Sequence, residues 1–474
     1  MSERLEQRPV AALRLEHDQL GAVEVPAGAL YGAHTARAVA NFPISGVPVG
    51  RLRELVVALA EVKQAAARTN RALGLLEEEV ADAISAACAE IVGGSWHDHF
   101  VVDCVQGGAG TSTNMNANEV VANRALELLG HPRGAYSVVH PLDSVNKSQS
   151  TNDVYPTALR LAAHRAVGRL IEALRHLQGA FTGKATEFTD VVTIGRTQLQ
   201  DAVPVSLGHV FAAYAVTLGE DCDRLTEVRG LLEEINLGGT AVGTGLNTDP
   251  RYASVARGHL SAITGIPLRT SPDLIEATQD TGVFVLLSGT VKRTAVKLSK
   301  ISNDLRLLSS GPRAGIGDIT LPAVQAGSSI MPGKVNPVIP EVVNQVAYGV
   351  IGNDLTITMA AEAGQLQLNA FEPVIIVRLL ESLSQLTAAS RVLADRCVAG
   401  ISVDRDELAR KVRHSIGLAT ALGPLLGHGE AAAVAREALA TGQDVPSVAL
   451  AQGLLSPEVL DRALAPQRLA RPHG

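Results

Sequence analysis

Long stretches in the middle of the 474-residue chain carry apolar side chains at intervals of three and four residues. Three such stretches span 159–181, 207–232 and 291–308, and a further helix is expected to follow Pro340, over 341–361. This spacing places the apolar residues on one face of an α-helix. Helices of such length bury these faces by packing as a roughly antiparallel bundle, so the sequence predicts a mainly α fold.

The composition agrees with closely packed helices and with a chain of two or three domains. Apolar residues make up 46% of the chain, but aromatic residues only 3%. The core must therefore consist of Leu, Val, Ile and Ala, a mixture that suits helices better than β-sandwiches. A chain of this length can bury a large core.

The balance of charge argues against a nucleic-acid partner. Acidic residues number 48 and basic residues 41, for a formal net charge of -7. Binding to phosphates needs clustered Lys and Arg, which this balance does not provide. An anionic substrate would therefore be attracted by local positive groups and not by the field of the whole protein.

Several features predict a cytoplasmic protein with no membrane contact. The four cysteines (Cys88, Cys104, Cys222, Cys397) are far apart and form no CxxC pair, as is typical of reduced thiols in the cytosol. The first ten residues are polar and charged and lack the core of a signal peptide. No apolar run approaches the roughly 18 residues that a membrane helix needs.

Segments rich in Gly, Ser, Thr and Asn separate the long helices, at 107–118, 146–153, 195–204, 238–247 and 311–340. Their spacing places them at helix ends, where a bundle can bring several together. From about residue 399 the pattern changes to short helices separated by Gly and Pro, and Ser456-Pro457 opens one of them with a cap and an N1 proline. We therefore predict three domains, a mostly helical N-terminal domain (1–148), a central bundle of long helices (149–398) and a small C-terminal helical domain (399–474).

Three possible ligand motifs fail on inspection. The run from Gly327 to Lys334 has five residues between its glycines, and Val335 stands where a phosphate loop needs Ser or Thr. Two GxG runs, at 108–110 and 243–245, lack the third glycine of a dinucleotide fingerprint. His97 and His99 have no partner motif for a metal. Nothing in the sequence demands a cofactor or a metal, although activation by a divalent metal remains open.

The block 327–337, GSSIMPGKVNP, is the most specific feature of the chain. It resembles the GSSxMPxKxN signature of the aspartase/fumarase superfamily, and every defined position matches. Three further blocks resemble those of the family in the same order, namely Gly110-Thr111-Ser112 with Asn114-Met115-Asn116, Ser150-Thr151-Asn152-Asp153, and Gly195-Arg196-Thr197. The resemblance covers nearly the whole chain from about Arg14.

The resemblance implies a three-domain, mainly α fold and a homotetramer built around a core of twenty helices. It also implies that each active site is assembled from three subunits. The reaction would remove a proton from the carbon next to a carboxylate of a small dicarboxylate and expel ammonia or water from the neighbouring carbon. Such a reaction needs a base near that carbon and donors that stabilise the doubly charged aci-carboxylate.

The resemblance also assigns roles to residues. Ser328 is the expected general base, acting as an alkoxide that backbone N–H groups and Lys334 could stabilise. The expected substrate-binding residues are Ser150, Thr151 and Ser329 at the reacting carboxylate, Thr197, Lys334 and Asn336 at the other, and Thr111 and Asn152 around the leaving group. Glycines at 311, 315, 327 and 333 would let the segment that carries Ser328 move as a lid.

Two blocks and one departure favour aspartate over malate as the substrate. The segments Gln106–Ser112 and Tyr31–Thr35 resemble those of aspartases more than those of fumarases. Many members have His after the Thr of the GRT block, paired in fumarases with a Glu that matches Glu341, but here that position is Gln198. The resemblance therefore implies that Gln198 binds substrate with Glu341 as its partner. A Gln cannot accept and return a proton, so hydration would suffer, whereas an ammonium group leaves already protonated.

The resemblance therefore favours deamination of L-aspartate to fumarate and ammonia. The alternatives are a class II fumarase, a lyase for a related or larger succinate derivative, and a catalytically idle, crystallin-like structural protein. Intact Ser328, Lys334 and Asn336 argue against the structural role.

Overall fold

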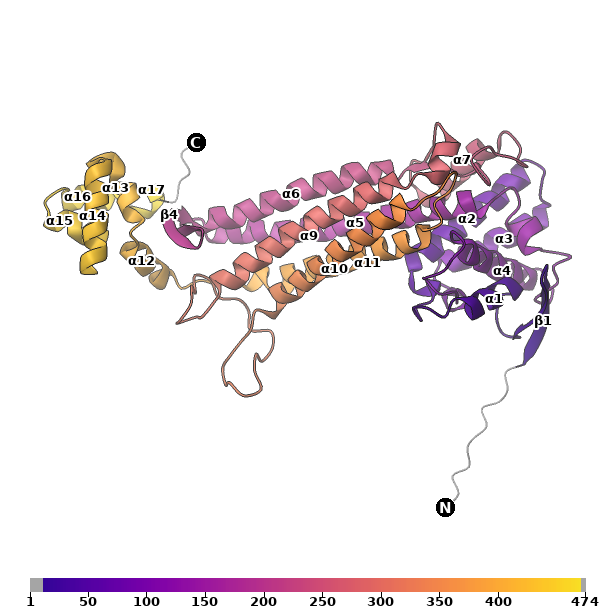
Figure 1. Cartoon of the computed structure of the whole chain (residues 1–474), viewed down its shortest axis with the longest axis horizontal. Coiled ribbons are helices and arrows are strands. Elements are labelled where there is room, and N and C mark those ends of the chain that lie inside the picture. The colour runs from indigo at the N-terminus through magenta and orange to yellow at the C-terminus, as the bar shows by residue number, and fades with distance from the viewer. Residues whose placement is uncertain (1–11, 470–474) are drawn as a thin grey trace, which may run out of the picture. The chain divides into compact units, whose positions relative to one another are not determined.

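The computed structural model describes residues 12–469, so the expectation for the charged segment 1–10 lies outside the described residues. Most elements are helices, and the strands of the described part form three two-stranded sheets (Figure 1). The described chain divides into two compact units. Unit 1 contains residues 12–169, 225–291 and 351–384, and unit 2 contains residues 170–224, 292–350 and 385–469. The predicted mainly α fold is confirmed.

Five long helices have one end in unit 1 and the other in unit 2. They are α5 (Thr151–Glu187), α6 (Leu207–Leu231), α9 (Gly282–Leu308), α10 (Val338–Glu362) and α11 (Glu372–Arg396). The apolar stripes seen in the sequence lie in α5, α6 and α9, and most of their members are buried. The helix expected over 341–361 is α10, which begins three residues earlier. Pro340 fits in its first turn because the N–H groups there have no partner within the helix, so the missing N–H of proline costs no hydrogen bond.

The rest of unit 1 consists of short strands and shorter helices. Its chain forms the antiparallel pair β1 (Leu13–Asp18) and β2 (Gly21–Pro26), and the parallel pair β5 (Glu234–Ile235) and β6 (Arg269–Thr270). Its shorter helices are α1 (Ala33–Asn41), α2 (Arg53–Ala72), α3 (Glu78–Val92), α4 (Thr111–Leu128), α7 (Tyr252–Thr264) and α8 (Leu274–Gln279). One-turn helices occupy Val49–Arg51 and His97–His99, and a π-turn occupies Pro141–Val145.

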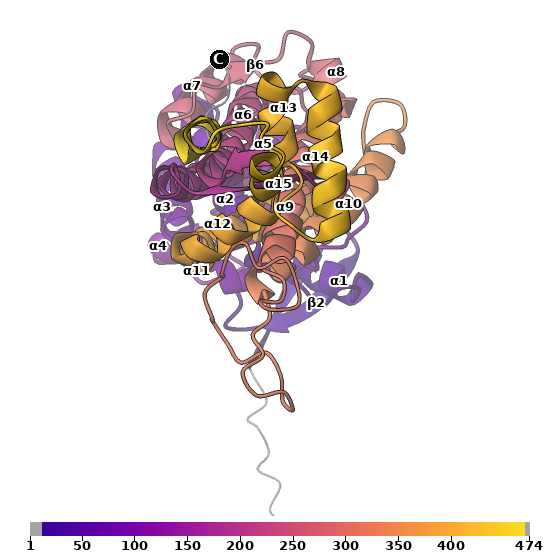
Figure 2. The ribbon, with the colours of Figure 1, turned by 90° about the vertical axis from the view of Figure 1, so that its left-hand side faces the viewer.

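Unit 2 contains a hairpin and the C-terminal helices. The hairpin consists of β3 (Val192–Thr197) and β4 (Gln200–Ser206), with a bulge between Ile194 and Arg196. A one-turn helix (Val398–Gly400) precedes α12 (Arg405–His414), α13 (Leu418–Leu426), α14 (His428–Thr441), α15 (Val445–Ala451), α16 (Pro457–Ala463) and α17 (Pro466–Leu469). These helices are in front in Figure 2. Ser456 caps α16 with its side chain, as predicted.

The core of the C-terminal helices includes a strand from much earlier in the chain. Ile194 of β3 packs with Val412, Leu422, Val434 and Val448 of four different helices. The hairpin is therefore part of the same hydrophobic cluster as α12–α16. The three-domain division drawn from the sequence stays a prediction.

Two segments expected to be loops have regular structure. α4 begins at Thr111, so most of 107–118 is helical. Ser, Thr and Asn favour caps and turns when exposed, but here Asn114, Asn116 and Asn118 are buried and their amides hydrogen-bond to other segments. The segment 195–204 belongs mostly to the β3–β4 hairpin, whose two-residue turn is Gln198-Leu199.

The aromatic contact around Phe181 in unit 2 gives a test of the core. Phe181 is fully buried, and its ring centroid lies 5.9 Å from that of Phe211 and 5.4 Å from that of Tyr214. Phe181→Ala should lower the free energy of unfolding by about 3–5 kcal/mol, because it leaves a cavity between these rings. Chemical denaturation at fixed subunit concentration measures the change. Glu172→Ala, at an exposed position of the same helix, is the control and should change it by less than about 0.5 kcal/mol. Equal effects of the two substitutions would contradict the assignment of Phe181 to the core.

Candidate active site

In unit 1, the N-terminal ends of α4 and α5 lie against each other, and each starts with a predicted site residue. Thr111 opens α4 and Thr151 opens α5, and the Asn114 side chain donates a hydrogen bond to the Thr151 hydroxyl (3.0 Å). Gly110 has φ +87°, and a Cβ there would come within 2.5 Å of the Tyr155 ring, so only glycine allows this approach. Two helix N-termini side by side favour a bound anion, which suits a carboxylate.

The buried carboxylate of Asp153 fixes the loop that carries Ser150, Thr151 and Asn152. One oxygen accepts from the Ser150 N–H (2.9 Å), and the other from the N–H groups of Gly238 (3.0 Å) and Thr240 (3.1 Å). The Asn152 amide donates to the carbonyl of Ala241 (2.7 Å), which joins the same two loops. Burial raises the pKa of Asp153 to about 6 in spite of these donors.

Lys63 of α2 binds the residues that precede Ser150 in the same loop, and no sequence motif pointed to it. Its buried Nζ donates to the side-chain oxygens of Asn146 and Gln149, at 2.9 Å each. The Asn146 oxygen also accepts from the amides of Asn114 and Asn118, at 3.2 Å each. Burial lowers the pKa of Lys63 to about 7. The sequence signal is a lysine in the middle of a helical stretch that is mostly apolar and rich in alanine.

In unit 2, the expected base Ser328 lies in a loop closed at its neck by hydrogen bonds. The Gly327 N–H donates to the carbonyl of Lys334 (2.9 Å), and the Asn336 amide donates to the carbonyl of Gly327 (2.7 Å). The Ser328 Oγ accepts from the N–H groups of Ile330 (3.2 Å) and Met331 (3.0 Å). These two donors would also stabilise an alkoxide at that oxygen.

The loop projects away from the two helices that flank it, α9 and α10 (Figures 1 and 2). Ser328 is half-buried, whereas Ser329 and Lys334 are exposed. The apolar side chain of Ile330 at the tip is 84% exposed. Such exposure of an apolar side chain is expected of a segment that closes over a ligand or meets another subunit.

Thr197 and Gln198 lie at the tip of the β3–β4 hairpin. Gln198 and Leu199 have φ values of 55° and 62°, a conformation that side chains other than glycine rarely adopt. Glu341, in the first turn of α10, faces Arg306 at 4.0 Å. Within residues 12–469, no hydrogen bond joins Glu341 to Gln198, so their predicted pairing finds no support in the single chain.

Within the described residues, the predicted site residues thus form separate groups. Unit 1 holds Thr111, Ser150, Thr151 and Asn152, which two helix ends and one buried carboxylate bring together. Unit 2 holds Ser328, Ser329, Lys334 and Asn336 in one loop, Thr197 and Gln198 on the hairpin, and Glu341 on α10. The roles assigned to these residues stay predictions.

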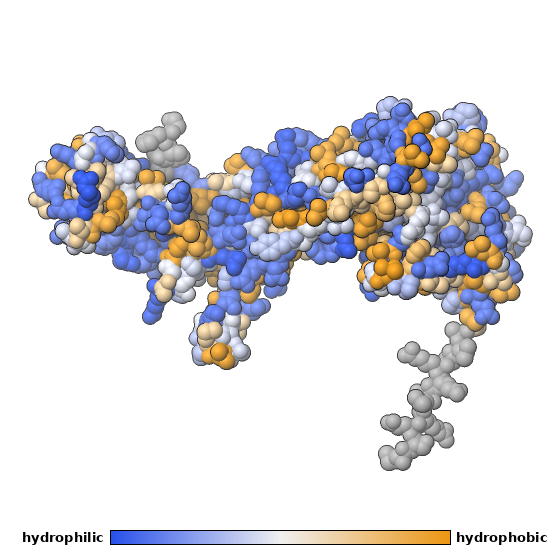
Figure 3. Space-filling view, viewed as in Figure 1, coloured by the Kyte–Doolittle hydropathy of each residue, from blue (hydrophilic) through white to orange (hydrophobic). Residues whose placement is uncertain are grey.

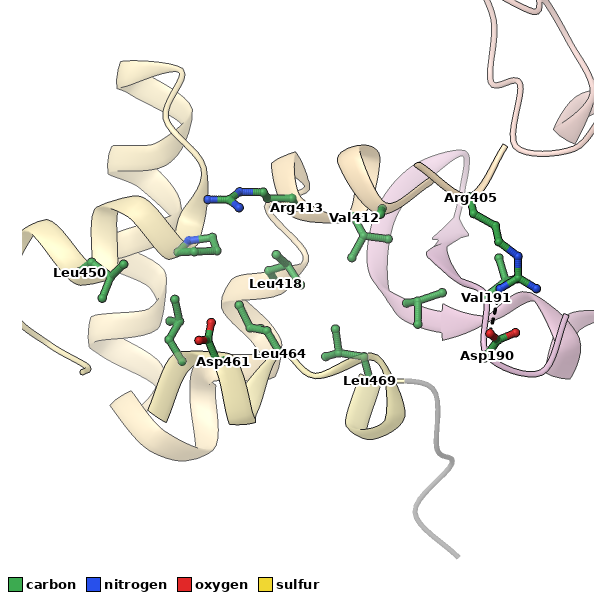
Figure 4. A pocket seen from close by; sticks show the side chains of 14 residues that line it. Asp190, Val191, Arg405, Val412, Arg413, Leu418, Leu450, Asp461, Leu464 and Leu469 are labelled. Carbon is green, nitrogen blue, oxygen red and sulfur yellow. Dashed lines mark hydrogen bonds and ion pairs between the residues drawn. The ribbon is translucent and has the colours of Figure 1, made fainter. Parts of the chain in front are cut away.

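A cavity of about 380 Å³ lies elsewhere, among the C-terminal helices of unit 2 (Figure 4). Its wall is largely aliphatic, with Leu418, Leu450 and Leu464 around it, and the Asp190–Arg405 ion pair lies at one end (2.8 Å). None of the predicted site residues lines this cavity, so it is separate from the expected chemistry.

Residues 12–469 contain no candidate metal centre and no candidate membrane span. No group of three or more His, Cys, Asp or Glu side chains is arranged to hold a metal ion. None of the helices there combines the length and the apolar character that crossing a bilayer requires. All four cysteines are buried, and none of them forms a disulfide.

The environment of Lys63 predicts a pH dependence of stability. The folded protein holds this lysine at a pKa of about 7, whereas a lysine in an unfolded chain titrates near about 10.4. Between these values the unfolded wild-type chain binds the extra proton, so its free energy of unfolding should rise with pH relative to that of Lys63→Met, by up to about 1.4 kcal/mol per pH unit. Denaturant unfolding at about pH 7, 8 and 9 measures the difference. Lys147→Met is the control, since that side chain is partly open to water and should leave the difference flat. Parallel curves for the wild type and Lys63→Met would contradict the burial of a neutral lysine.

Comparison with known proteins places these features in a family. A family model described as "Lyase" matches residues 21–352, and one described as "Fumarase C C-terminus" matches residues 418–471. An aspartate ammonia-lyase of Pseudomonas fluorescens is 56% identical over 463 residues, which cover 98% of this chain and 97% of that protein. An aspartate ammonia-lyase of Escherichia coli (strain K12) is 50% identical over 461 residues, covering 97% of this chain and 96% of that protein.

Solved structures agree over the same length. A fumarate lyase:delta crystallin from Brucella melitensis, bound to cobalt, superimposes with a TM-score of 0.95 at 56% identity and covers 97% of this chain and 100% of that one. A recombinant class II fumarase from Schistosoma mansoni gives a TM-score of 0.92 at 36% identity, covering 98% of this chain and 100% of that one. By sequence and by structure over almost its whole length, the chain belongs to the aspartase/fumarase superfamily of lyases.

Proposed function

We propose that the chain is an aspartate ammonia-lyase, a carbon–nitrogen lyase that reversibly converts L-aspartate to fumarate and ammonia. The full-length relatives that carry this name are 49–56% identical to it. The structural observation that carries the proposal is the position of Ser328 in a largely exposed loop. Its Oγ accepts hydrogen bonds from two backbone N–H groups. That environment lowers the cost of forming an alkoxide and so makes a serine usable as a base.

In the proposed reaction, the Ser328 alkoxide takes the proton from the β-carbon of aspartate. The electrons of that C–H bond move into the adjacent carboxylate, which becomes an aci-carboxylate with two negative charges. Collapse of this intermediate forms the carbon–carbon double bond and breaks the bond from the α-carbon to nitrogen. The ammonium group leaves with its own protons, and the proton on Ser328 is returned to solvent before the next turnover.

The donors for this intermediate are proposed from both units. Ser150, Thr151 and Ser329 donate to the aci-carboxylate, and Ser150 and Thr151 lie where two helix N-termini already favour negative charge. Thr197, Lys334 and Asn336 hold the other carboxylate, while Thr111 and Asn152 surround the leaving group. Closure of the part of the loop that carries Ser328 would bring this residue to the substrate and expel water.

The proposed choice of aspartate over malate depends on Gln198. An amide in the turn of the β3–β4 hairpin can donate and accept hydrogen bonds but cannot carry a proton to or from a hydroxyl group. Loss of water from malate needs such a proton, whereas loss of ammonium does not. A class II fumarase is the second candidate, because a solved enzyme of that name shares 36% identity and the fold.

We also propose a homotetramer with active sites shared between subunits and a cytoplasmic location. In unit 1, the exposed residues Ile351, Leu355 and Met359 follow each other at four-residue intervals on one face of α10, with 40%, 62% and 63% of their surface open. Apolar (orange) surface is visible along the long helices in Figure 3. A monomer gains nothing from such a face, whereas helix packing between subunits would bury it. Four buried cysteines that form no disulfide suit a reducing compartment.

The first test is the formation of fumarate, followed by ultraviolet absorbance, from L-aspartate and from L-malate. The wild type should act on aspartate alone, and Ser328→Ala should lower kcat by at least about 10²–10⁴-fold because the general base is lost. Ala323→Ser, an exposed change in the same loop, is the control and should leave kcat within about twofold. Fumarate from malate alone would overturn the substrate, and an active Ser328→Ala would overturn the base.

The assembly has a separate test. Leu355→Glu with Met359→Glu places charges on the apolar face of α10, so light scattering should report a mass below that of four 49.4-kDa chains, together with loss of activity. Leu439→Glu is the matched control, since that leucine of α14 is 66% exposed but lies among the C-terminal helices. A tetramer that persists in the double variant would contradict the role of this face.

A further inference from the structure

Asp318 lies at the start of the segment that carries Ser328, accepts three side-chain hydrogen bonds and has no role in the proposed chemistry. Its side chain is fully buried. One oxygen accepts from Thr193 Oγ1 (3.1 Å) and Arg196 Nη1 (2.6 Å), both on β3, and the other accepts from Lys411 Nζ (3.1 Å) on α12. One carboxylate therefore joins three segments that are distant in sequence.

The two cations, Arg196 and Lys411, also contact the segments that carry the proposed site residues of unit 2. Arg196 directly precedes Thr197 and Gln198, so its bond to Asp318 fixes the strand that carries them. Lys411 donates to the carbonyls of Ile316 and Gly317 in addition to Asp318. Lys411 thus holds three consecutive residues at the start of the loop against α12.

Backbone contacts fix Asp318 and the residues next to it as well. The N–H groups of Asp318 (2.8 Å) and Ile319 (3.3 Å) both donate to the carbonyl of Leu308, at the end of α9. Thr320 and Ser402 exchange two backbone hydrogen bonds (2.8 and 3.1 Å), which tie the loop to the segment that precedes α12. From Thr320 onwards the chain runs to Ser328 through exposed and half-buried residues. These contacts therefore anchor residues 316–320, ahead of the part of the loop that carries Ser328.

We propose that Asp318 and Lys411 act as positioning residues, which fix the root of the Ser328 loop to the hairpin β3–β4 and to α12. The C-terminal helices then have a defined task in the reaction. Through Lys411 they hold the fixed end about which the loop closes, and Asp318 joins that end through Arg196 to the strand of Thr197. This inference rests on the proposed function for its kinetic part, but its structural part concerns the loop alone.

Two cations on α12, Lys411 and Arg405, allow a test of this role by comparison. Lys411 bonds the root of the loop, whereas Arg405, six residues earlier, pairs with Asp190 at 2.8 Å and does not touch the loop. Both links join α12 to an earlier part of unit 2 through a carboxylate. Lys411→Met removes the contact that reaches the segment carrying Ser328, and Arg405→Met removes a more exposed ion pair of the same helix that does not reach it.

The structural readout is trypsin cleavage of the native, full-length protein in the loop, at the exposed residues Arg313 and Lys334. Lys411→Met should be cut several times faster than the wild type, Arg405→Met at the wild-type rate, and Lys411→Arg close to the wild-type rate. Thermal unfolding checks that each variant is folded. Equal cleavage of Lys411→Met and Arg405→Met would overturn the anchoring role, whether or not the enzyme acts on aspartate.

The kinetic readout separates positioning from general damage. Lys411→Met should lower kcat for aspartate about tenfold with KM changed less than twofold, because the loop delivers the base, and Lys411→Arg should restore most of the rate. Asp318→Asn should lower kcat and raise KM, since it also releases Arg196 beside Thr197. A combined Asp318→Asn, Lys411→Met variant should be no slower than Asp318→Asn alone. Independent, multiplying losses would show that the two residues do not act together.

Discussion

Both groups of candidate site residues depend on one kind of interaction, in which a buried aspartate accepts hydrogen bonds from several donors. In unit 1, Asp153 binds three backbone N–H groups and joins the loop of Ser150 and Thr151 to the loop of Gly238 and Thr240. In unit 2, Asp318 binds one hydroxyl and two cations and joins the root of the Ser328 loop to the hairpin and to α12. A loop has few apolar contacts to hold it, so a charged acceptor shared by several donors gives it a defined position.

This way of fixing loops has an energetic cost, which the ionisable groups reveal. Burial raises the pKa of Asp153 to about 6 and lowers that of Lys63 to about 7. Both shifts mean that the folded chain disfavours the charged forms, although each group is well supplied with hydrogen bonds. Long helices with aliphatic cores supply the stability that offsets this cost, and the loops at their ends hold the polar groups.

Much of the fold could be predicted because its signals are local. The intervals of three and four residues identified α5, α6 and α9, and Ser456-Pro457 identified the start of α16. The loop 327–337 could be recognised from its residues alone. Segments in which local preference and tertiary contact disagree were predicted less well. The asparagines at 114, 116 and 118 looked like loop residues but lie inside α4, because their amides have hydrogen-bond partners up to 37 residues away.

The sequence by itself determined the helical architecture, the family and the residue types available for catalysis, since these follow from periodicity and from contiguous motifs. Only the tertiary structure decided how those residues are supported. Lys63 reaches partners 83 and 86 residues away, and Asp318 reaches partners 93, 122 and 125 residues away. No periodic pattern encodes such pairs, because a hydrogen bond between distant residues depends on how the helices pack and not on the residues beside it in the chain. The same holds for Gln198, whose backbone conformation is set by the twist of the two strands that it connects.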